Sequence, residues 1–229
     1  MPRTDRKPRR AVKRRAAHQG NIGGSPPPRA GPRPSLRDRK KLETRYALAS
    51  VAAELFGKRG FDAVTIDQIA DAAGVSRRTY FRYFATKEAV VFPRAADRLE
   101  RFRTMLARYR DRDSPFSAVR RACLEMAEEF GSHREELLLQ HRIVESSAML
   151  ISHQSALDLE WEAAIAEALM RGTSRGARRG ASILAGAVMG AIRATLREWY
   201  IGEARADPVA LANEMLTLVE RGLQPWRIR

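Results

Sequence analysis

The sequence predicts an all-α protein of about nine helices, and three observations support this fold class. Apolar residues recur every three or four positions through nearly every segment after residue 35, which is the spacing of a helix with one buried face. No segment alternates apolar and polar residues between turn signals, as a half-buried strand would. The 229 residues are 44% apolar, enough for one or two cores, and no apolar run approaches the ~18 residues of a membrane-spanning helix.

The first expected helix covers about residues 36–58. Ser35 precedes it as an N-cap, and Gly57 and Gly60 can end it because glycine takes a left-handed backbone conformation at little cost. One helical stripe should face the core, formed by Leu42, Tyr46, Ala49, Ala53 and Phe56.

Two short helices joined by a tight turn are expected next. Thr65 is a good N-cap, and Gln68 three residues later completes a capping box. Gly74 supplies the turn, and Ser76 caps a second helix that should run from Arg77 to Phe84. This order of caps and turn glycine is typical of a helix-turn-helix.

The second of these helices has two different faces. Tyr80 and Phe84 lie four residues apart and should pack inward together. The other face is cationic and carries one aromatic side chain; its members are Arg77, Arg78, Phe81 and Arg82. A DNA major groove admits one helix, and arginine pairs with guanine through two hydrogen bonds, so this face predicts DNA binding. The alternative is a helical hairpin whose charged face is only solvated.

The remaining helices are predicted from the same periodicity and from caps. Thr86 should cap a fourth helix that Pro93 kinks and that resumes to about Tyr109. Asp207 and Pro208 form an N-cap and first-turn pair for the last helix, to about Arg221. Between these, helices are expected from Pro115 onward, over Glu135–Ser147, over 150–170 and over 181–201, with a basic, glycine-rich loop at 171–180.

The net charge of +15 is concentrated near the N-terminus. Residues 1–35 hold ten Lys or Arg and one Asp, and residues 36–92 hold eleven Lys or Arg and seven acids. We therefore expect a polyanionic partner at this end. The Arg-, Pro- and Gly-rich tail cannot bury enough surface to fold, so it should be disordered. It either contacts phosphates loosely, is an extension of no consequence, or reflects a start codon placed too far upstream.

Cellular location is indicated by what the sequence lacks. Cys123 is the only cysteine, so no disulfide forms within the chain, and the cytosol is the simplest compartment. The basic N-terminus is not followed by an apolar segment, so we expect no secretory signal, and it lacks the apolar face of a membrane-binding helix. Cys123 shares a helical stripe with Val119 and Met126, which predicts a core residue; the alternative is a redox-sensing thiol.

The segment from about Arg37 to Phe92 resembles the N-terminal domain of the TetR-type family of bacterial transcription regulators. The resemblance lies in YALASVAAELFGKRGFDAVTI, from Tyr46 to Ile66, and in DQIADAAGVSRRTYFRYFATKEAVV after it. The cluster YFRYF followed by Lys-Glu is its most specific part. The resemblance implies three parts: a tail at 1–35, a DNA-binding domain at 36–92, and an effector-binding and dimerisation domain at 93–229. It also implies a homodimer that binds a palindromic operator in double-stranded DNA and is released by a small-molecule effector.

The resemblance implies roles for individual residues of the DNA-binding domain. Thr65, Ser76 and Tyr83 should bind phosphates, as should Lys87. Arg78 stands where the family often has a small residue, so docking depth and operator composition are open. The full expected DNA-binding set is Thr65, Ser76, Arg77, Arg78, Thr79, Phe81, Arg82, Tyr83 and Lys87, in which the three arginines reach base edges and Phe81 touches a thymine methyl or sugar.

The C-terminal half resembles an actinobacterial group that includes the mycofactocin-system regulator, which implies an apolar effector such as an acyl-CoA thioester. This resemblance is carried by HRIVESSAMLISHQSALDLEWEAAIAEAL and ILAGAVMGAIRATLREWY. Pocket candidates are apolar residues, or lone polar residues on apolar helices: Met126, Phe130, His141, Glu145, Met149, Trp161, Ile165, Met189 and Arg193. The alternative for each Met and Trp is ordinary core packing. His133, His141 and His153 have no tight spacing and no cysteine partner, so neither a metal site nor a cofactor is expected.

The last two long helices are expected to form the dimer. Small residues such as Ala185, Gly186 and Gly190 allow helices to approach closely. The expected interface residues are Leu184, Val188, Ala191, Thr195, Trp199 and Met215. The alternative is that the small residues pack within one subunit.

The sequence has three alternative functional interpretations. An enzyme is disfavoured because the sequence holds no phosphate loop, nucleophile elbow or HExxH motif. A nucleoid-associated protein that coats DNA without sequence preference would show a steep salt dependence and no operator. An activator of the same fold cannot be separated from a repressor by sequence.

Overall fold

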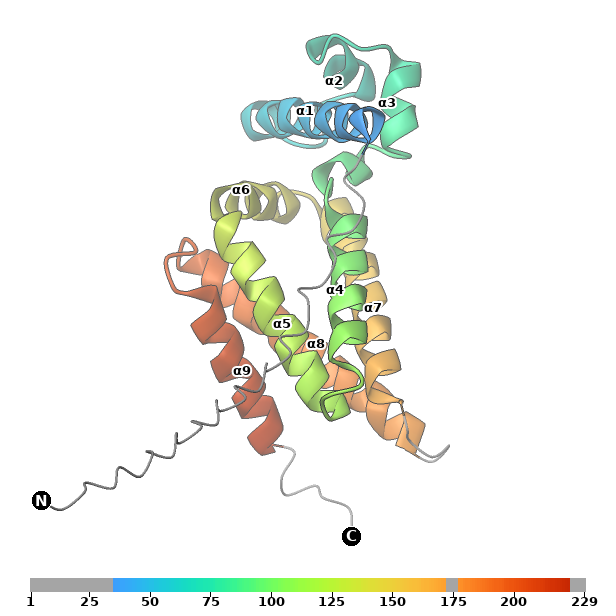
Figure 1. The fold of residues 1–229 in the computed structure, drawn as a ribbon. Coiled ribbons are helices and arrows are strands. Elements are labelled where there is room, and N and C mark those ends of the chain that lie inside the picture. Colours follow the sequence, from blue (N-terminus) through green and yellow to red (C-terminus); the bar gives the residue numbers. More distant parts are fainter. Residues whose placement is uncertain (1–34, 172–176, 223–229) are drawn as a thin grey trace, which may run out of the picture. The chain divides into compact units, whose positions relative to one another are not determined.

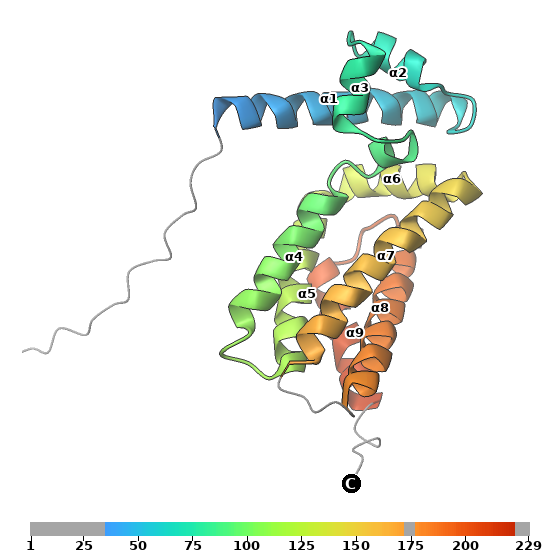
Figure 2. The same cartoon turned by 90° about the vertical axis from the view of Figure 1, so that its right-hand side faces the viewer.

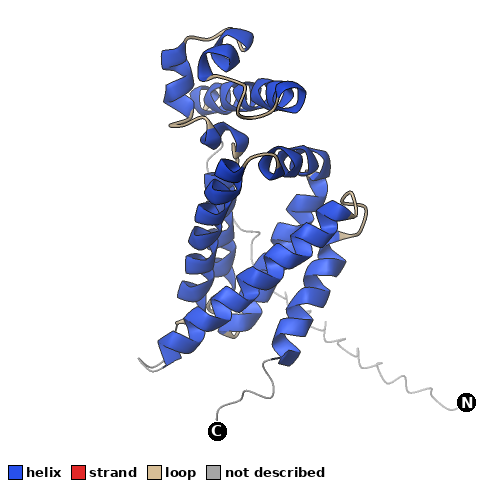
Figure 3. Ribbon diagram, turned by 180° about the vertical axis from the view of Figure 1, so that it is seen from behind, coloured by secondary structure: helices blue, strands red, loops and turns tan. Residues whose placement is uncertain are grey.

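The computed structural model describes residues 35–171 and 177–222, and every regular element within these ranges is a helix (Figure 3). The all-α prediction is confirmed, since nine α-helices and one 3₁₀ helix, η1, occur there. The predicted disorder of the tail lies outside the described residues, as do residues 172–176 of the predicted 171–180 loop, whereas residues 177–180 of that loop belong to α8. The elements are α1 (Leu36–Arg59), α2 (Ile66–Ala72), α3 (Arg77–Tyr83), η1 (Glu88–Val91), α4 (Ala95–Tyr109), α5 (Pro115–Ser132), α6 (Arg134–Glu145), α7 (Ala148–Leu169), α8 (Ala177–Ile201) and α9 (Pro208–Gly222) (Figure 1).

The local signals in the helix-turn-helix act as the sequence predicts. Thr65 and Gln68 form both hydrogen bonds of the capping box at the start of α2. Gly74 has φ of +65°, which other residues rarely adopt, and lets the chain turn directly into α3. The Ser76 hydroxyl caps α3 by accepting the Thr79 N–H at 3.1 Å. These bonds set the angle between α2 and α3 and so fix which face of α3 is exposed.

The helix-turn-helix does not have a core of its own. Its buried residues include Phe56, Ile69 and Tyr80, and the same cluster continues into η1 through Val91 and Phe92. The C-terminal helices complete this cluster with Ile143, Val144 and Leu150. The packing of α1 to α3 therefore depends on α6 and on the first turn of α7.

The segment predicted as one kinked helix after Thr86 is two separate elements. η1 ends at Val91, and α4 begins at Ala95 on the far side of Pro93. Proline lacks the backbone N–H that a continuous helix needs, which explains the break.

The remaining helices form a second core between α4, α5, α7, α8 and α9. Figure 2 shows these long helices side by side, with α6 lying across the end of the bundle next to α1. In α6 the buried residues are Leu137, Ile143 and Val144, which contact two different clusters, because α6 packs on two sides. None of the helices in the described ranges is long and apolar enough to cross a membrane.

Candidate functional site

The exposed face of α3 is cationic. Arg77, Arg78 and Arg82 are exposed, as is Phe81, whereas Tyr80 is fully buried and donates its hydroxyl to the Thr86 carbonyl at 3.1 Å. Tyr80 and Phe84 lie in the core, as the four-residue spacing predicts. Since buried tyrosine and phenylalanine anchor one side of this short helix, its arginines all project away from the protein.

The three arginines have different partners. Arg77 is held by both carboxylate oxygens of Asp67 in α2, at 2.8 and 2.7 Å. Arg82 contacts the hydroxyl of Tyr83 at 3.3 Å. Arg78 has no hydrogen-bond or ion-pair partner in the described part of the chain. Arg78 can therefore meet a base without breaking an existing bond, while Arg77 must first exchange Asp67 for DNA.

The hydroxyl groups around α3 suit phosphate contacts. Thr65 and Ser76 are exposed, and the Ser76 hydroxyl also donates to Thr79 Oγ1 at 3.0 Å. A hydrogen bond from Thr44, together with the charges of Arg82 and Lys41, lowers the pKa of Tyr83. The cationic surface at Tyr83 thus extends from α3 to the start of α1, which favours an anionic partner.

Lys87 differs from its predicted role. Its Nζ donates hydrogen bonds to the carbonyls of Phe61 and Val64, at 3.0 and 3.1 Å, and lies 4.1 Å from the centre of the Phe61 ring. These carbonyls belong to the connection between α1 and α2, where the Phe61 carbonyl also accepts the Val64 N–H at 3.3 Å. In this structure Lys87 holds that connection together rather than projecting toward a phosphate.

A cavity of about 190 Å³ lies within the C-terminal helices. Side chains from every helix between α4 and α9 line it, and Phe92 reaches it from the segment after η1. Its apolar lining includes Phe102, Met126, Trp161, Met189, Ile192 and Leu211. Its polar lining consists of Arg98, Gln140, Gln154, Asp158, Thr195 and Tyr200. A mostly apolar wall with a few converging polar groups is typical of a small-molecule site.

Four of the predicted pocket residues line this cavity: Met126, Phe130, Trp161 and Met189. Five do not. Ile165 is fully buried in the core, and Met149 is 58% exposed on the surface of α7. His141 stacks on Tyr200 with 4.2 Å between ring centres, Glu145 is exposed, and Arg193 lies 3.9 Å from Asp158 with half of its side chain in solvent. The predicted helices do line the cavity, but these five residues lie on parts of those helices that do not face it.

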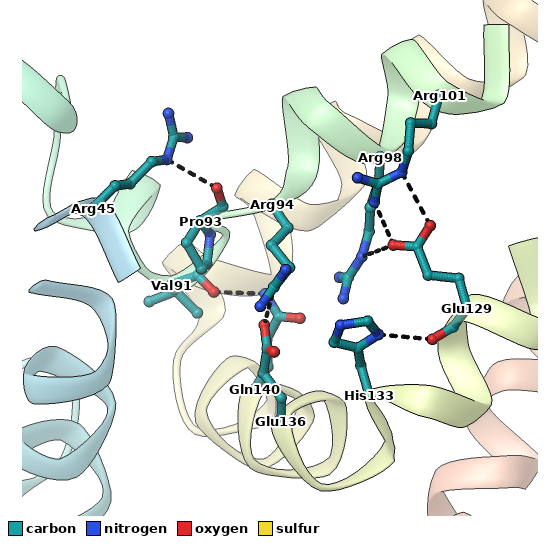
Figure 4. A network of polar contacts seen from close by, with 10 residues as sticks. All are labelled: Arg45, Val91, Pro93, Arg94, Arg98, Arg101, Glu129, His133, Glu136 and Gln140. Atoms are coloured by element: carbon teal, nitrogen blue, oxygen red, sulfur yellow. Dashed lines mark hydrogen bonds and ion pairs between the residues drawn. The ribbon is translucent and has the colours of Figure 1, made fainter. Parts of the chain in front are cut away.

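An arginine-rich network of polar contacts includes two residues of the cavity lining, Arg98 and Gln140 (Figure 4). Arginines at the start of α4 and within it face carboxylates of α5 and α6: Arg94, just before α4, bonds Glu136 at 2.9 Å, and Arg101 bonds Glu129 through both oxygens. Arg98 lies 3.5 Å from Glu129 and over the Phe130 ring. It is 93% removed from solvent, with 7% of its surface exposed, and burial lowers its pKa.

Burial raises the pKa of the other titratable groups of the cavity. Burial raises the pKa of Tyr200 to about 12 and that of Cys123 to about 12. Burial also raises the pKa of Asp158, against the opposing effects of a hydrogen bond from Gln154 and the charge of Arg193. The core position predicted for Cys123 is confirmed, and its raised pKa makes a reactive thiolate unfavourable.

The expected dimer residues mostly face inward. Val188, Trp199 and Met215 are buried within the subunit, Thr195 lines the cavity, and Leu184 and Ala191 are half-buried against the core. The Trp199 indole donates to the Ala206 carbonyl at 2.9 Å. The exposed apolar side of α8 instead carries Ile183, Ala187, Ala194 and Ile201, and α9 exposes Leu218.

Arg98, Gln140 and Asp158 were missed as site residues. A signal for Arg98 existed, because it lies four residues before Phe102 and so shares the inward face of α4. In the described ranges no group of three or more His, Cys, Asp or Glu side chains could hold a metal ion.

These features define a class of protein: a helix-turn-helix with a cationic second helix, attached to a helical domain that encloses a ligand-sized cavity, as in ligand-responsive transcription regulators. Residues 48–92 match the model of bacterial regulatory proteins of the tetR family, and residues 113–224 match the MftR C-terminal domain. The chain belongs to the TetR family. It is a DNA-binding transcription regulator, since the family consists of regulators and not of enzymes.

Individual relatives agree with this assignment. The mycofactocin biosynthesis transcriptional regulator MftR of Mycobacterium tuberculosis is 30% identical over 144 residues, which cover 61% of this chain and 71% of the relative. Among solved structures, NalD, the secondary repressor of the MexAB-OprM multidrug efflux pump in Pseudomonas aeruginosa, shares the fold with a TM-score of 0.56 and 22% identity, over 81% and 97% of the two chains. FadR of Thermus thermophilus, a repressor in complex with lauroyl-CoA, has a TM-score of 0.53 and 24% identity, over 81% and 96%.

Proposed function

We propose that this regulator is a repressor that binds a near-palindromic operator as a homodimer and leaves it when an apolar effector enters the cavity. The observation that carries the proposal is the position of Phe92. Its ring is buried in the core of the helix-turn-helix and also lines the cavity. A ligand that displaces Phe92 therefore changes the packing that orients α3.

DNA recognition is assigned to the exposed face of α3. Arg78 is the first candidate for a base edge, because its guanidinium has no competing partner among the described residues. Arg77 and Arg82 can also contact base edges after their bonds to Asp67 and Tyr83 break. Two copies of α3 in successive major grooves must lie roughly 34 Å apart, which requires a dimer with a defined angle between its subunits.

The dimer is assigned to the outward side of α8 and α9. Ile183, Ile201 and Leu218 are 65%, 69% and 62% exposed. On α8 the residues at 183, 187, 194 and 201 repeat at spacings of four and seven, which places them along one side of the helix. Large apolar side chains in such a row indicate an association surface. We assign the dimer interface to this row and not to the inward-facing residues expected from the sequence.

The effector is assigned to the cavity because its wall is mostly apolar. The FadR structure from Thermus thermophilus holds lauroyl-CoA in the same fold, so acyl-CoA thioesters belong in the first panel of candidates. Within the chain, residues 36–92 carry DNA binding and residues 93–229 carry effector binding and dimerisation.

The test is a binding selection on genomic fragments with the purified protein, repeated with acyl-CoA thioesters and with free carboxylic acids. A single near-palindromic site, protected by two subunits and released by one ligand, is the expected result. Binding to every fragment at low salt, unaffected by any ligand, would instead support a nucleoid-associated protein. A Ile183→Glu, Ile201→Glu variant should be monomeric in light scattering and lose the operator, whereas Met149→Glu, an equally exposed site on α7, should change neither.

A further inference from the structure

The side chain of Arg98 is incompletely bonded within the protein. Its Nε and Nη2 atoms are buried, and neither has a hydrogen-bond partner. The nearest carboxylate oxygen, Oε1 of Glu129, lies 3.5 Å from Nε, which is an ion-pair distance without hydrogen-bond geometry. Buried donors are almost always paired in folded proteins, so two unpaired donors on one guanidinium require an explanation.

The neighbouring carboxylates are bonded to other arginines. Glu129 uses Oε2 to bond Nε of Arg101 at 3.1 Å and uses Oε1 to bond Nη2 of the same residue. Glu136 bonds Arg94 at 2.9 Å. These two glutamates are also the carboxylates whose charges act on Arg98. Three arginines therefore share two carboxylates. The arginine left without a hydrogen-bonded carboxylate is the buried one, Arg98.

The unpaired donors point to a carboxylate. Nε and Nη2 lie on the same edge of the planar guanidinium, and their N–H bonds are parallel. Two parallel donors match the two oxygens of a carboxylate, which is the strongest pairing that arginine makes. Arg98 lines the cavity, and so does Tyr200, whose charge interaction with Arg98 shows that the two are neighbours. The Tyr200 hydroxyl remains protonated and can donate a third hydrogen bond.

The cavity limits the size of the group attached to that carboxylate. Its volume of about 190 Å³ is slightly larger than the ~150 Å³ of a cavity that holds benzene and smaller than the ~300 Å³ at which drug-sized sites begin. The apolar wall near Phe102, Trp161 and Met189 suits one aromatic ring or a medium-length acyl chain. Asp158 also lines the cavity, but its carboxyl group accepts a hydrogen bond from Gln154 and lies 3.9 Å from Arg193, and it is not among the groups whose charges act on Arg98.

We propose that the cavity binds a small apolar carboxylic acid in its ionised form, with the carboxylate on the Nε and Nη2 edge of Arg98 once that buried edge turns toward the cavity. This inference rests on the proposed function only in taking the cavity as the effector site. It distinguishes a free acid from its coenzyme A thioester, because the thioester carbonyl carries no charge for Arg98.

The test compares phenylacetate and octanoate with phenylacetamide, octanamide and octanoyl-CoA, by calorimetry on the full chain and by the fluorescence of Trp161 and Trp199. The carboxylates should bind about tenfold or more tightly than the matching amides, since each amide loses the charge-assisted pairing. Arg98→Met should abolish this preference. Arg98→Lys keeps the charge but loses the parallel donors, so it should retain part of the preference for carboxylates. It replaces Arg98→Met as the test variant if Arg98→Met does not fold.

Arg103→Met is the matched control. It removes an exposed arginine of α4 that neither lines the cavity nor bonds Glu129, so it should leave the preference for carboxylates unchanged. Equal binding of acids and amides, or binding of octanoyl-CoA alone, would overturn the inference. Operator release by a neutral ligand would also overturn it while leaving the proposed function intact. A carboxylate that binds through Arg98 without affecting DNA would confirm the inference and count against the effector role.

Discussion

The side-chain amide of Gln140 donates a hydrogen bond of 2.6 Å to the backbone carbonyl of Val91. Gln140 lines the cavity from α6, and Val91 is the last residue of η1, buried in the core of the helix-turn-helix. Just beyond it, the Pro93 carbonyl accepts a hydrogen bond of 2.9 Å from Arg45 of α1 (Figure 4). Because residues 91–93 are bonded to the cavity wall on one side and to α1 on the other, we expect a change in the cavity to reach the DNA-binding helices through them.

Gln140→Leu should weaken the response to effector more than it weakens the binding of effector. Loss of the bond leaves the Val91 carbonyl unpaired and should cost about 1–2 kcal/mol of stability. The ratio of operator affinities with and without effector should fall several-fold, measured by titrating labelled operator. Gln154→Leu is the control, because Gln154 also lines the cavity but bonds Asp158 instead of η1. Equal loss of response in both variants would show that the Val91 bond does not carry the coupling.

Arg78→Ala should weaken operator binding by about 1–3 kcal/mol and relax the preference at one base pair, as expected for an arginine that pairs with a base edge. A set of operators changed one base pair at a time measures both effects. Arg103→Ala, which removes an exposed arginine from α4, should change neither. An equal loss on random DNA would mean that Arg78 contacts only phosphate.

Asp67→Asn should strengthen DNA binding. The carboxylate holds Arg77 at 2.7 Å, and both side chains are more than half exposed, so the pair is worth only about 0.2–1 kcal/mol. Releasing Arg77 and removing a negative charge near DNA should raise the affinity about two- to fivefold and steepen its dependence on salt. Asp71→Asn removes the same charge from α2 without releasing an arginine, so its effect should be smaller. Weaker binding by Asp67→Asn would show that Asp67 orients Arg77 for DNA.

The helix-turn-helix could be predicted from sequence because its signals are local. Thr65, Gln68, Gly74 and Ser76 each act on backbone groups within three residues, and the structure shows those bonds. The hydrogen bonds that Lys87 makes within the protein could not be predicted, since the carbonyls that accept them lie 23 and 26 residues away in the sequence.

The cavity and the dimer face depend on contacts between helices that no single segment reveals. In the sequence, Arg98 looks like any surface arginine. Its lack of a hydrogen-bonded carboxylate arises only in the folded protein, where the glutamates of α5 and α6 bond Arg101 and Arg94. In α8, apolar residues occur on both sides of the helix, so periodicity cannot tell the inward Val188 and Trp199 from the outward Ile183 and Ile201. Packing against α7 and α9 decides which side is buried.

Asp158→Asn should change how stability depends on pH. Burial raises the pKa of Asp158 in the folded protein above its unfolded value near 3.8, so the folded state binds the proton more tightly. Its contribution to stability is therefore full below pH 3.8 and is lost as pH rises through the folded pKa. The stability of the Asn variant relative to the wild type should increase as pH rises from 4 toward 7, measured by urea unfolding at fixed protein concentration. A relative stability that falls over this range would show that the pairing with Gln154 and Arg193 outweighs burial.

Arg98→Met should make the ligand-free protein more stable even though it removes a charged residue from a network of ion pairs. The guanidinium is buried with two unpaired donors, and its removal leaves Glu129 bonded to Arg101. Replacing a poorly compensated buried ion by an apolar side chain of similar length is often stabilising by about 1–4 kcal/mol. We expect a gain of about 1 kcal/mol in the free energy of unfolding, measured by urea titration without ligand. Arg101→Met should instead be neutral or destabilising, since Glu129 would then have only Arg98 at an unfavourable angle. A stability loss in Arg98→Met would mean that the arginine supports the fold; a gain, combined with lost carboxylate binding, would mean that its charge is retained for the ligand.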